Sequence, residues 1–526
     1  MEISAQNGYA NRHENGEANG HGGSYFPEAI GQTRQRKAVI VGAGPVGCFA
    51  AIALANKGWS VDLYEGRADK RLRKSEEGQR SINLVLSSRG LAALYAIDPC
   101  LEERLMKQTI PIHSRMIHMK DGSSSGLQYD PHKQTINSIS RSLLNEKLME
   151  EALLVPNIRF FFEHKPQTID FDRRVLNVHD VTADTMKQVG FDLCVGADGS
   201  HSFVRRQIMR VTRMDYQQEY IPHEYMELKM PAACDEDGNL TFALDPNHLH
   251  IWPRHSFMLM GLPNQDKSFT CTLFAPTADF ARITRPALFV RWMEEHFPDA
   301  VPLIGERELA DMWVTNPRGA LITVKATPYH YKDRGIILGD AAHSQVPFYG
   351  QGLNCGLEDV RVLDHLLREC KVAPVVELKG SDKTQEDEKM AAALTKYTQT
   401  RHEDLVAICD MAMRQYIEMR HDVTTLSFRL RKKIDNLLYK WGGKEPETLR
   451  SLGPQFHKDV YPSAQPRGWM PLYTMVTFRP DVGYAAVKTK AERQTRILNA
   501  IGIGAGFFGV VSVVGLAYHR LHGRRW

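Results

Sequence analysis

The sequence predicts an α/β protein in which a parallel-sheet domain is joined to an antiparallel β-sheet domain, a helical C-terminal region and a single C-terminal membrane helix. Three observations carry this prediction. An apolar strand, a glycine-rich turn, a helix and a second strand follow one another near the N-terminus. Runs of alternating polar and apolar residues fill the middle of the chain. An uncharged apolar stretch lies near the C-terminal end.

The composition of the 526 residues is that of an ordinary globular protein, with 43% hydrophobic and 24% charged residues. A net charge of +4 is small for this length, so it does not favour nucleic-acid binding. The eight cysteines are scattered and form no C-x-x-C pair. This spacing argues against a disulfide framework or a zinc site and favours a reducing compartment.

Residues 1–36 are rich in Gly, Asn, His and Glu and contain no apolar run, so we expect a disordered tail there. The tail lacks the apolar core of a secretory signal. Four acidic residues also make it a poor mitochondrial presequence. They are Glu2, Glu14, Glu17 and Glu28.

The first informative stretch covers residues 37–67. A buried strand is expected over 38–41, a helix over 45–57 and a second strand over 60–64. The turn between the first strand and the helix has the spacing G-x-G-x-x-G. This order of elements is typical of a dinucleotide-binding βαβ unit.

Each glycine of that turn has a physical role in such a unit. Gly42 permits the tight turn, Gly44 lets the backbone approach a pyrophosphate, and Gly47 lets the helix lie against the strand. The helix N-terminus offers free N–H groups to phosphates. Glu65 follows the second strand, where an acid can bind a ribose diol.

Strands and helices continue to about residue 154. Arg141 opens a helix that Ser140 is expected to cap, so its side chain is placed either to meet a phosphate or to lie in solvent as an ordinary surface arginine. The expected elements are strands at 82–86, 115–119 and 135–139 and helices at 89–95 and 141–154.

A second buried strand is expected at 191–195, followed by a GADG turn and a Ser-capped helix, and the pattern of apolar residues changes after it. Alternating runs between 214 and 274 predict antiparallel strands. We therefore expect residues 37–214 and 326–370 to form the first domain and 215–325 a β-sheet substrate domain. Part of 107–140 is expected to line the substrate site. His250 and Trp252 are interpreted as packing residues of the sheet.

The third informative stretch is RGIILGDAAHSQVPFYGQGLN, at residues 334–354. A strand ends at Gly339, and Asp340 follows it, beside the start of an amphipathic helix. An acid at the carboxyl end of a parallel strand, near a helix N-terminus, is a ligand-site arrangement in open α/β sheets. Asp340 can accept hydrogen bonds from a ribityl hydroxyl, and the helix at Leu353 and Asn354 can stabilise negative charge on a reduced flavin. For His343 a structural role is favoured over acid–base work.

The rest of the chain is expected to be an exposed loop (371–389) and a helical region (390–480), with a short strand or extended segment at 473–478. Residues 497–518 carry no charge, are about long enough to cross a bilayer and are flanked by basic residues. We expect a membrane anchor there. Its short basic tail favours the mitochondrial outer membrane, with the catalytic domain facing the cytosol, over the endoplasmic reticulum. A buried helix is the alternative.

The GAGPVG, GADG and GDAAH…PFYGQGLN segments together resemble the flavin-dependent aromatic hydroxylases. Further segments, including RSINLVLSSRG, IPIHSRMIH, PNHLHIWPR and PLYTMVTF, narrow the resemblance to the branch that acts on L-kynurenine. The resemblance covers about 37–478 and the C-terminal anchor. It implies a Rossmann-like FAD-binding domain, bound FAD, and NADPH and O₂ as co-substrates.

The resemblance also implies site residues. Arg115 matches the arginine that binds the substrate carboxylate, with Tyr129 and Tyr473 as hydrogen-bonding partners. Gln415 stands where the family has an asparagine and is one methylene longer. Phe348 and Glu418 match residues near the substrate. The residues at flavin positions, together with the glycine-rich turn, are Gly42, Gly44, Val46, Gly47, Tyr64, Glu65, Gly66, Arg67, Val85, Arg141, Asp340, Leu353 and Asn354.

The implied reaction is hydroxylation of L-kynurenine to 3-hydroxykynurenine through a flavin C4a-hydroperoxide, a step of tryptophan degradation toward NAD synthesis. The cofactor performs this chemistry, and the sequence accordingly offers no convincing catalytic triad or metal site. Two alternatives stay open at this point. One is a flavin monooxygenase that acts on a phenolic acid. The other is a non-catalytic carrier on the same fold, like the Rab GDP-dissociation inhibitors.

Overall fold

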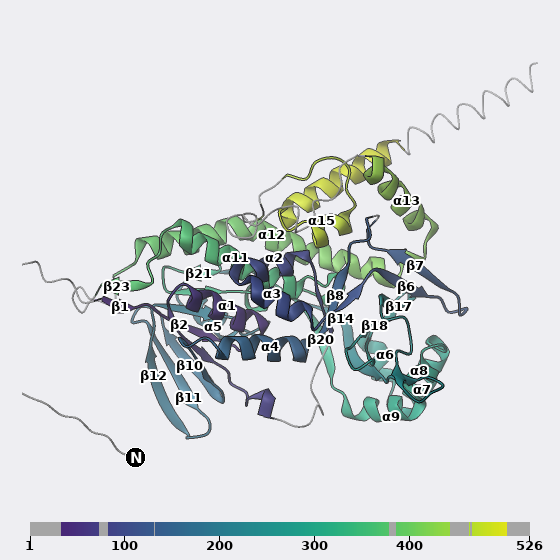
Figure 1. The fold of residues 1–526 in the computed structure, drawn as a ribbon, viewed down its shortest axis with the longest axis horizontal. Helices are drawn as coiled ribbons and strands as arrows, with labels where there is room; N and C mark the ends of the chain where they lie inside the picture. The colour runs from purple at the N-terminus through teal and green to yellow at the C-terminus, as the bar shows by residue number, and fades with distance from the viewer. Residues whose placement is uncertain are drawn as a thin grey trace, which may run out of the picture.

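The computed structural model describes residues 33–72, 83–130, 132–377, 385–441, 462 and 465–501. Two large sheets lie side by side, and the long helix α12 (Glu388–Arg420) runs along both of them (Figure 1). The short ribbon of β10–β12 projects from the first sheet, and helices α6–α9 lie beyond the second (Figure 1).

The first large sheet has six strands, and its apolar runs are buried as the sequence predicts. Five neighbouring strands of this sheet are parallel, and the sixth, at one edge, is antiparallel to its neighbour. Buried parallel strands of this kind need helices on both faces. In spatial order the strands are β21 (His330–Tyr331), β22 (Gly335–Ile337), β13 (Leu193–Gly196), β2 (Lys37–Val41), β3 (Ser60–Tyr64) and β9 (Ile158–Phe161).

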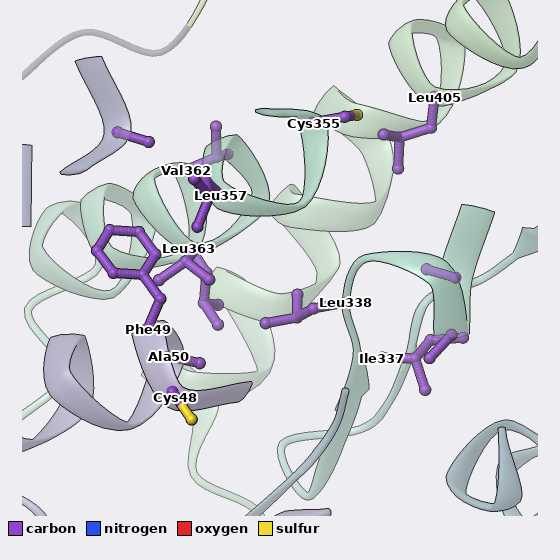
Figure 2. Packing of buried hydrophobic residues seen from close by; sticks show 14 of the residues in the cluster. Cys48, Phe49, Ala50, Ile337, Leu338, Cys355, Leu357, Val362, Leu363 and Leu405 are labelled. Atoms are coloured by element: carbon purple, nitrogen blue, oxygen red, sulfur yellow. The ribbon is translucent and has the colours of Figure 1, made fainter. Parts of the chain in front are cut away.

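The expected βαβ unit is confirmed, since β2 and β3 pair in parallel around helix α1 (Pro45–Asn56). Phe49 and Ala50 of α1 face Leu357 and Leu363 of helix α11 in a shared apolar layer (Figure 2). The helices that belong to this domain are α1, α2 (Ser88–Ile97), α3 (Pro99–Met106), α4 (Arg141–Leu153), α5 (Phe203–Ile208), α10 (Asp340–His343) and α11 (Gly352–Glu369), with the short 3₁₀ turns η1 (Lys70–Leu72) and η2 (Pro347–Tyr349).

Ser140 caps α4 as expected, because its side chain accepts a hydrogen bond from the Leu143 N–H.

Four small sheets complete the strand pairing. The small sheets are β4 (Asn83–Leu86), β8 (Ile136–Ser140) and β5 (Ile110–Ile112); β10 (His164–Asp170), β11 (Val175–Asp180) and β12 (Thr185–Gly190); β15 (Ala233–Cys234) and β16 (Leu240–Thr241); and β1 (Thr33–Gln35) and β23 (Val375–Glu377).

The second large sheet has seven strands, and two of them come from the N-terminal part of the chain. Strand β6 pairs in parallel with β17, and β7 continues the sheet beyond it. Residues 114–128 are thus built into the sheet of the second domain. The strands in spatial order are β20 (Arg318–Thr327), β14 (Asp215–Met230), β19 (Phe269–Pro276), β18 (Phe257–Pro263), β17 (His248–Arg254), β6 (Ser114–His118) and β7 (Ser124–Gln128).

The second domain also contains helices, which its prediction as a β-sheet domain did not include. Their apolar faces form a separate buried cluster with the sheet, around Trp252, Phe289 and Met293. His250 and Trp252 are buried in the sheet, as expected for packing residues. The helices are α6 (Thr277–Arg282), α7 (Pro286–His296), α8 (Val301–Ile304) and α9 (Glu306–Thr315).

The C-terminal region is helical, as predicted, but one segment differs. Residues 473–478, expected to be extended, lie in helix α15 (Leu472–Phe478), which is almost wholly buried. Tertiary packing here overrides the strand preference of its Tyr, Thr, Val and Phe residues. Beyond α12 the chain forms the turn η3 (Asp422–Thr424) and helix α13 (Leu426–Trp441), and residues 484–501 are helical.

Two predicted boundaries also differ from the structure. The end of the expected tail is folded, because Thr33–Gln35 pairs with Val375–Glu377, inside the expected exposed loop. Arg34 and Arg36 stabilise this pair through Asp192 and Asp387.

Within the described residues no helix is long and apolar enough to cross a membrane. The predicted anchor at 497–518 lies outside them except for its first five residues.

Candidate active site

A cavity of about 1050 Å³ lies between the glycine-rich turn and the seven-stranded sheet. The structure brings together there residues that are hundreds of positions apart in the chain. Ten of the predicted site residues line it, which are Gly44, Val46, Arg67, Val85, Arg115, Arg141, Asp340, Phe348, Leu353 and Tyr473.

The glycine-rich turn shapes one wall of the cavity. Gly42 has φ +102°, and a Cβ on it would lie 2.5 Å from the Ala197 carbonyl oxygen. A Cβ on Gly47 would lie 2.0 Å from the Gly42 carbonyl oxygen, so both positions exclude any larger residue. A Cβ on Gly44 would meet nothing within 4 Å. Gly44 lines the cavity and is the N-cap residue of α1, whose first N–H groups carry no side-chain cap. This is the cradle that a pyrophosphate needs.

Glu65 is positioned by the turn itself. One of its carboxylate oxygens accepts from the Ala43 N–H at 3.1 Å, and the other accepts from the Arg67 N–H at 3.0 Å and from Arg67 Nε at 2.8 Å. Burial raises the pKa of Glu65, but the bonds from Arg67 outweigh it and leave this pKa below its ordinary value. Glu65 is therefore a charged brace between β3 and the glycine-rich turn.

Two neighbours of Glu65 were also predicted at flavin positions, and neither lines the cavity. Tyr64 is buried and stacks on Phe161 with ring centroids 4.8 Å apart. A Cβ on Gly66 would lie 3.3 Å from Lys165 Cγ. Only Arg67 from this group reaches the cavity wall.

The start of helix α11 lies beside the glycine-rich turn, since a Cβ on Gly356 would lie 2.6 Å from Val46 Cγ2. Asp340 is exposed at the first position of α10, directly after Gly339, whose φ is +58°. Leu353 lines the cavity one residue before Asn354. Uncapped N–H groups at the start of an 18-residue helix favour negative charge nearby. This end of α11 therefore suits a ligand group that becomes anionic.

The Asn354 side chain is committed to the protein. Its amide donates to the Val85 and Gly350 carbonyls, both at 2.7 Å, and accepts from the Ser87 N–H at 2.8 Å. A Cβ on Gly90 would lie 2.4 Å from its Oδ1. Asn354 thus ties α11 to the β4–α2 turn and supports the cavity wall from behind.

Arg115 on β6 is a buried cation with few protein contacts. Its acidic partner is Glu418, at 3.4 Å from Nη1 to Oε1. Its Nε has no hydrogen-bond partner among the described residues, and neither has the buried Tyr129 hydroxyl. Burial lowers the pKa of Arg115, but the oxygens of Tyr473, Tyr129 and Glu418 outweigh it, so this pKa lies above its ordinary value. A charged, buried and under-bonded guanidinium fits an anionic ligand group.

Three tyrosine rings lie in parallel beside Arg115. Tyr129 stacks on Tyr473 at 4.9 Å, and Tyr473 stacks on Tyr349 at 5.8 Å. The Arg115 guanidinium carbon lies 5.5 Å from the Tyr129 ring and 4.9 Å from the Tyr473 ring. The stack fixes the direction of the guanidinium.

Helix α12 supplies two polar side chains next to Arg115. Gln415 is buried and donates from Nε2 to Glu418 Oε1 at 3.0 Å, the same oxygen that Arg115 contacts. Glu418 thereby links Arg115 and Gln415, two of the predicted substrate-binding side chains. Gln415, Glu418 and Tyr129 surround Arg115 but are not part of the cavity wall.

Phe348 closes the apolar part of the site. Its ring stacks on Tyr416 at 4.0 Å and lies 4.8 Å from the Phe274 ring. The cavity is also lined by Leu249, Met260 and Leu262 from the antiparallel sheet. This arrangement provides an apolar slot for an aromatic ring next to the charged Arg115 end.

Sequence reasoning missed four residues of this site. Tyr349 and Tyr416 directly follow Phe348 and Gln415, so adjacency was the available signal. Gln345 lines the cavity, and both of its amide atoms are buried without a partner in the described part of the chain. Lys432 on α13 donates to the Gln128 carbonyl at 2.7 Å. Burial and the charge of Arg115 lower the pKa of Lys432 to about 7, although Glu418 acts in the opposite direction. No local pattern indicated Gln345 or Lys432.

His343 belongs to a buried ion-pair network behind the cavity. Its Nε2 lies 2.5 Å from Asp359 Oδ2, while Arg401 donates to Asp359 Oδ1 at 2.9 Å and to Cys355 Sγ at 3.6 Å. His343, Cys355 and Asp359 are close enough to hold a metal ion. The Arg401 guanidinium already neutralises this carboxylate, so the contacts account for the cluster as a structural network.

FAD fits these residues. The open Gly44 cradle suits a pyrophosphate, Asp340 can accept from ribityl hydroxyls, and the start of α11 suits the ring system. The unpartnered Gln345 amide offers further donors and acceptors at the same wall.

Comparison with known proteins agrees with this fold. Residues 35–371 match the family model described as FAD binding domain. The chain is similar to solved structures of 2-methyl-3-hydroxypyridine-5-carboxylic acid oxygenase (TM-score 0.57, 21% identity, 74% of this chain and 94% of that one) and of Klebsiella pneumoniae HpxO complexed with FAD and uric acid (TM-score 0.54, 18% identity, 76% and 92%). These structural likenesses concern the fold. The matched family model and the cavity together define an FAD-binding protein.

The relatives by sequence are more specific. The chain is 42% identical over 500 residues to a kynurenine 3-monooxygenase of Cryptococcus neoformans, covering 91% of this chain and 96% of that one. It is 41% identical to the enzyme of that name from Candida albicans (92% and 96%) and 38% identical to that from Saccharomyces cerevisiae (87% and 93%). The chain belongs to the kynurenine 3-monooxygenase family.

Proposed function

We propose that this protein hydroxylates L-kynurenine to 3-hydroxykynurenine, with bound FAD, NADPH and O₂. The single observation that carries the proposal is the under-bonded Arg115 guanidinium beside an apolar, aromatic slot. Kynurenine has the matching shape, with a carboxylate at one end and an aniline ring at the other. The family membership supports the same substrate.

The protein's residues position this substrate. Arg115 binds the α-carboxylate with its planar guanidinium, and the Tyr129–Tyr473–Tyr349 stack keeps that guanidinium in place. Gln415 and Glu418 lie next to Arg115, where Glu418 accepts from Gln415 and pairs with Arg115. The rings of Phe348, Tyr416 and Phe274 exclude water from the reacting ring.

Residues of the first domain would hold FAD. Gly44 and the start of α1 would hold the pyrophosphate, Asp340 would hold the ribityl chain, and the N-terminus of α11 would stabilise negative charge on the ring. When bound, FAD accepts electrons from NADPH and activates O₂ for transfer to the substrate ring. The chain supplies binding, orientation and a dry site.

The test is NADPH oxidation by the purified holoenzyme with and without L-kynurenine, with the product identified by mass spectrometry. We expect kynurenine to stimulate oxidation and 3-hydroxykynurenine to form. Stimulation by 4-hydroxybenzoate instead would favour a phenolic-acid hydroxylase. A colourless protein that cannot be reconstituted with FAD would favour a non-catalytic carrier.

We further propose that residues 497–518 anchor the protein in the mitochondrial outer membrane, with the catalytic domain in the cytosol. The uncharged apolar sequence between two basic clusters supports an anchor. Alkaline carbonate extraction should leave the full chain in the membrane pellet, and protease added to intact mitochondria should digest the catalytic domain. Release of the full chain by carbonate would contradict the anchor.

A further inference from the structure

Helix α13 (Leu426–Trp441) has an amphipathic pattern that is inverted relative to a helix of a water-soluble surface. Its most exposed apolar residues are Leu426 (82%), Leu430 (61%), Leu437 (46%) and Trp441 (76%). At about 100° per residue, these four lie within about 60° of one another around the helix axis. They form one stripe along the outer side, which we call the leucine stripe.

The opposite side of α13 faces the protein and is polar or aromatic. Lys432 donates to the Gln128 carbonyl, Asp435 accepts from Trp469 Nε1 at 2.9 Å, and the Tyr439 ring contacts His132 edge-on at 5.2 Å. The helix is therefore fixed in its rotation by specific contacts. Its leucines point outward because other residues occupy the inward side.

Cations border the leucine stripe on one side. Arg429, Lys433 and Lys440 are exposed and lie next to the stripe on the helical wheel. Leucine and tryptophan on one face with Lys and Arg beside them is the pattern of a helix lying in the headgroup region of a membrane, where the cations meet anionic lipids. Apolar residues exposed so regularly are unusual on a surface that contacts only water.

The position of α13 supports the same partner. Arg431 contacts Thr495 at 3.4 Å, so α13 lies beside the helical segment 484–501. That segment ends with exposed Ile497 (41%) and Ile501 (61%) and leads into the uncharged sequence up to residue 518. α13 and this segment occupy the same corner of the molecule (Figure 1). Both helices therefore expose apolar residues in this corner of the molecule.

We propose that α13 is an in-plane membrane helix, whose leucine stripe lies in the headgroup region of a bilayer that contains anionic lipid. This is a second lipid contact, separate from the predicted anchor. It fixes one orientation of the catalytic domain on the membrane, which a single spanning helix does not do. It also supports α13 in the position where Lys432 reaches the strand that precedes Tyr129.

The test uses the full chain reconstituted in phosphatidylcholine vesicles with or without phosphatidylserine. Exposed or half-exposed Cys100, Cys234 and Cys370 are replaced by Ser, and an environment-sensitive fluorophore is attached at Leu430→Cys. The matched control is Val314→Cys. Val314 is 72% exposed and lies on α9, in the second domain. Quenching by lipids that carry a spin label is measured at both positions.

We expect quenching at position 430 to exceed that at 314 by about threefold or more and its emission to shift to the blue. Adding Lys433→Glu and Lys440→Glu should remove the part of the quenching that depends on phosphatidylserine. Equal quenching at 430 and 314 would overturn the proposal. Shielding at 430 that depends on protein concentration but not on quencher lipid would show a second copy of the chain on this face. The readout does not involve turnover, so it is independent of whether kynurenine is the substrate.

Discussion

Arg115 shows how one side chain can define the polarity of a whole site. It is buried, charged and close to three tyrosine rings, yet its Nε has no hydrogen-bond partner in the described structure. A buried cation left in that state would be costly without a ligand that completes its bonding. The substrate is therefore expected to complete an arrangement that the protein has prepared.

Replacing Arg115 with Ala should raise the KM for L-kynurenine about 10- to 100-fold, since charge-assisted hydrogen bonds contribute about 1.5–3 kcal/mol. FAD should stay bound, because the residues of the glycine-rich turn are untouched. Steady-state kinetics and the flavin absorption spectrum measure the two quantities. Arg173→Ala, at an exposed arginine, is the control. An unchanged KM would remove Arg115 from the substrate site.

Gly90 offers a second test at this scale. A Cβ there would lie 2.4 Å from Asn354 Oδ1, so Gly90→Ala should displace Asn354 and cost about 1–3 kcal/mol of stability. Because Asn354 holds the start of α11, we also expect weaker FAD binding. Thermal unfolding and FAD titration measure both effects. Gly126→Ala is the control, since a Cβ there meets nothing within 4 Å. If both variants behave alike, Asn354 does not depend on Gly90.

At the scale of elements, local patterns and long-range contacts contributed differently to what the sequence could predict. The β2–α1–β3 unit was placed within one or two residues because its strands and its glycine-rich turn are signals of adjacent residues. Helix α15 was assigned wrongly, because its residues prefer strands and only burial between other helices makes it helical. The pairing of β6 with β17 joins segments more than a hundred residues apart and left no local signal.

Candidate site residues divide in the same way. Some of those in glycine-containing motifs, such as Gly44 and Asp340, line the cavity as expected. Tyr64 and Gly66 were carried over from the resemblance and lie away from the cavity wall. Lys432 could not be found, since its role depends on how α13 folds back over β7.

Lys432 makes the stability depend on pH. Its pKa is lowered to about 7 in the folded protein, whereas an exposed lysine in the unfolded chain titrates near 10.5. Between these values the folded state binds fewer protons, so the contribution of Lys432 to stability improves as the pH rises, and its cost is greatest below about pH 7. Lys432→Met should therefore be more stable than the parent at pH 6, and this advantage should shrink toward pH 10.

Chemical denaturation at several pH values measures this dependence. Lys433→Met is the control, because Lys433 is exposed on the same helix. A constant difference between Lys432→Met and the parent across the range would show that Lys432 titrates as an ordinary lysine.

At the scale of the whole molecule, buried charges join the C-terminal segment to the first domain. Arg89 is wholly buried, lies 3.3 Å from Glu358 of α11 and donates to the Val476 and Val482 carbonyls at 2.7 and 2.5 Å. Its guanidinium also lies 4.0 Å from the Tyr484 ring. One side chain thereby links α2, α11, α15 and the start of the last helical segment.

Replacing Arg89 with Leu should destabilise the protein by about 3–5 kcal/mol, because Glu358 would remain as a buried carboxylate that has lost a partner. The loss should be smaller in Arg89→Leu combined with Glu358→Gln. Lys107→Leu, which breaks an exposed pair with Glu103, should change stability by less than about 1 kcal/mol. Urea unfolding of the four proteins measures these differences. Equal losses in all variants would exclude the buried network as the cause.

The parallel pairing of β6 with β17 has a mechanical consequence. Because β6 and β7, from the N-terminal part of the chain, are hydrogen-bonded onto one end of the second sheet, the two domains are joined through this sheet. A hinge that opened them like jaws would have to break that ladder. Tyr473 of the short helix α15 lines the cavity, so displacement of this segment would open the site without breaking the ladder.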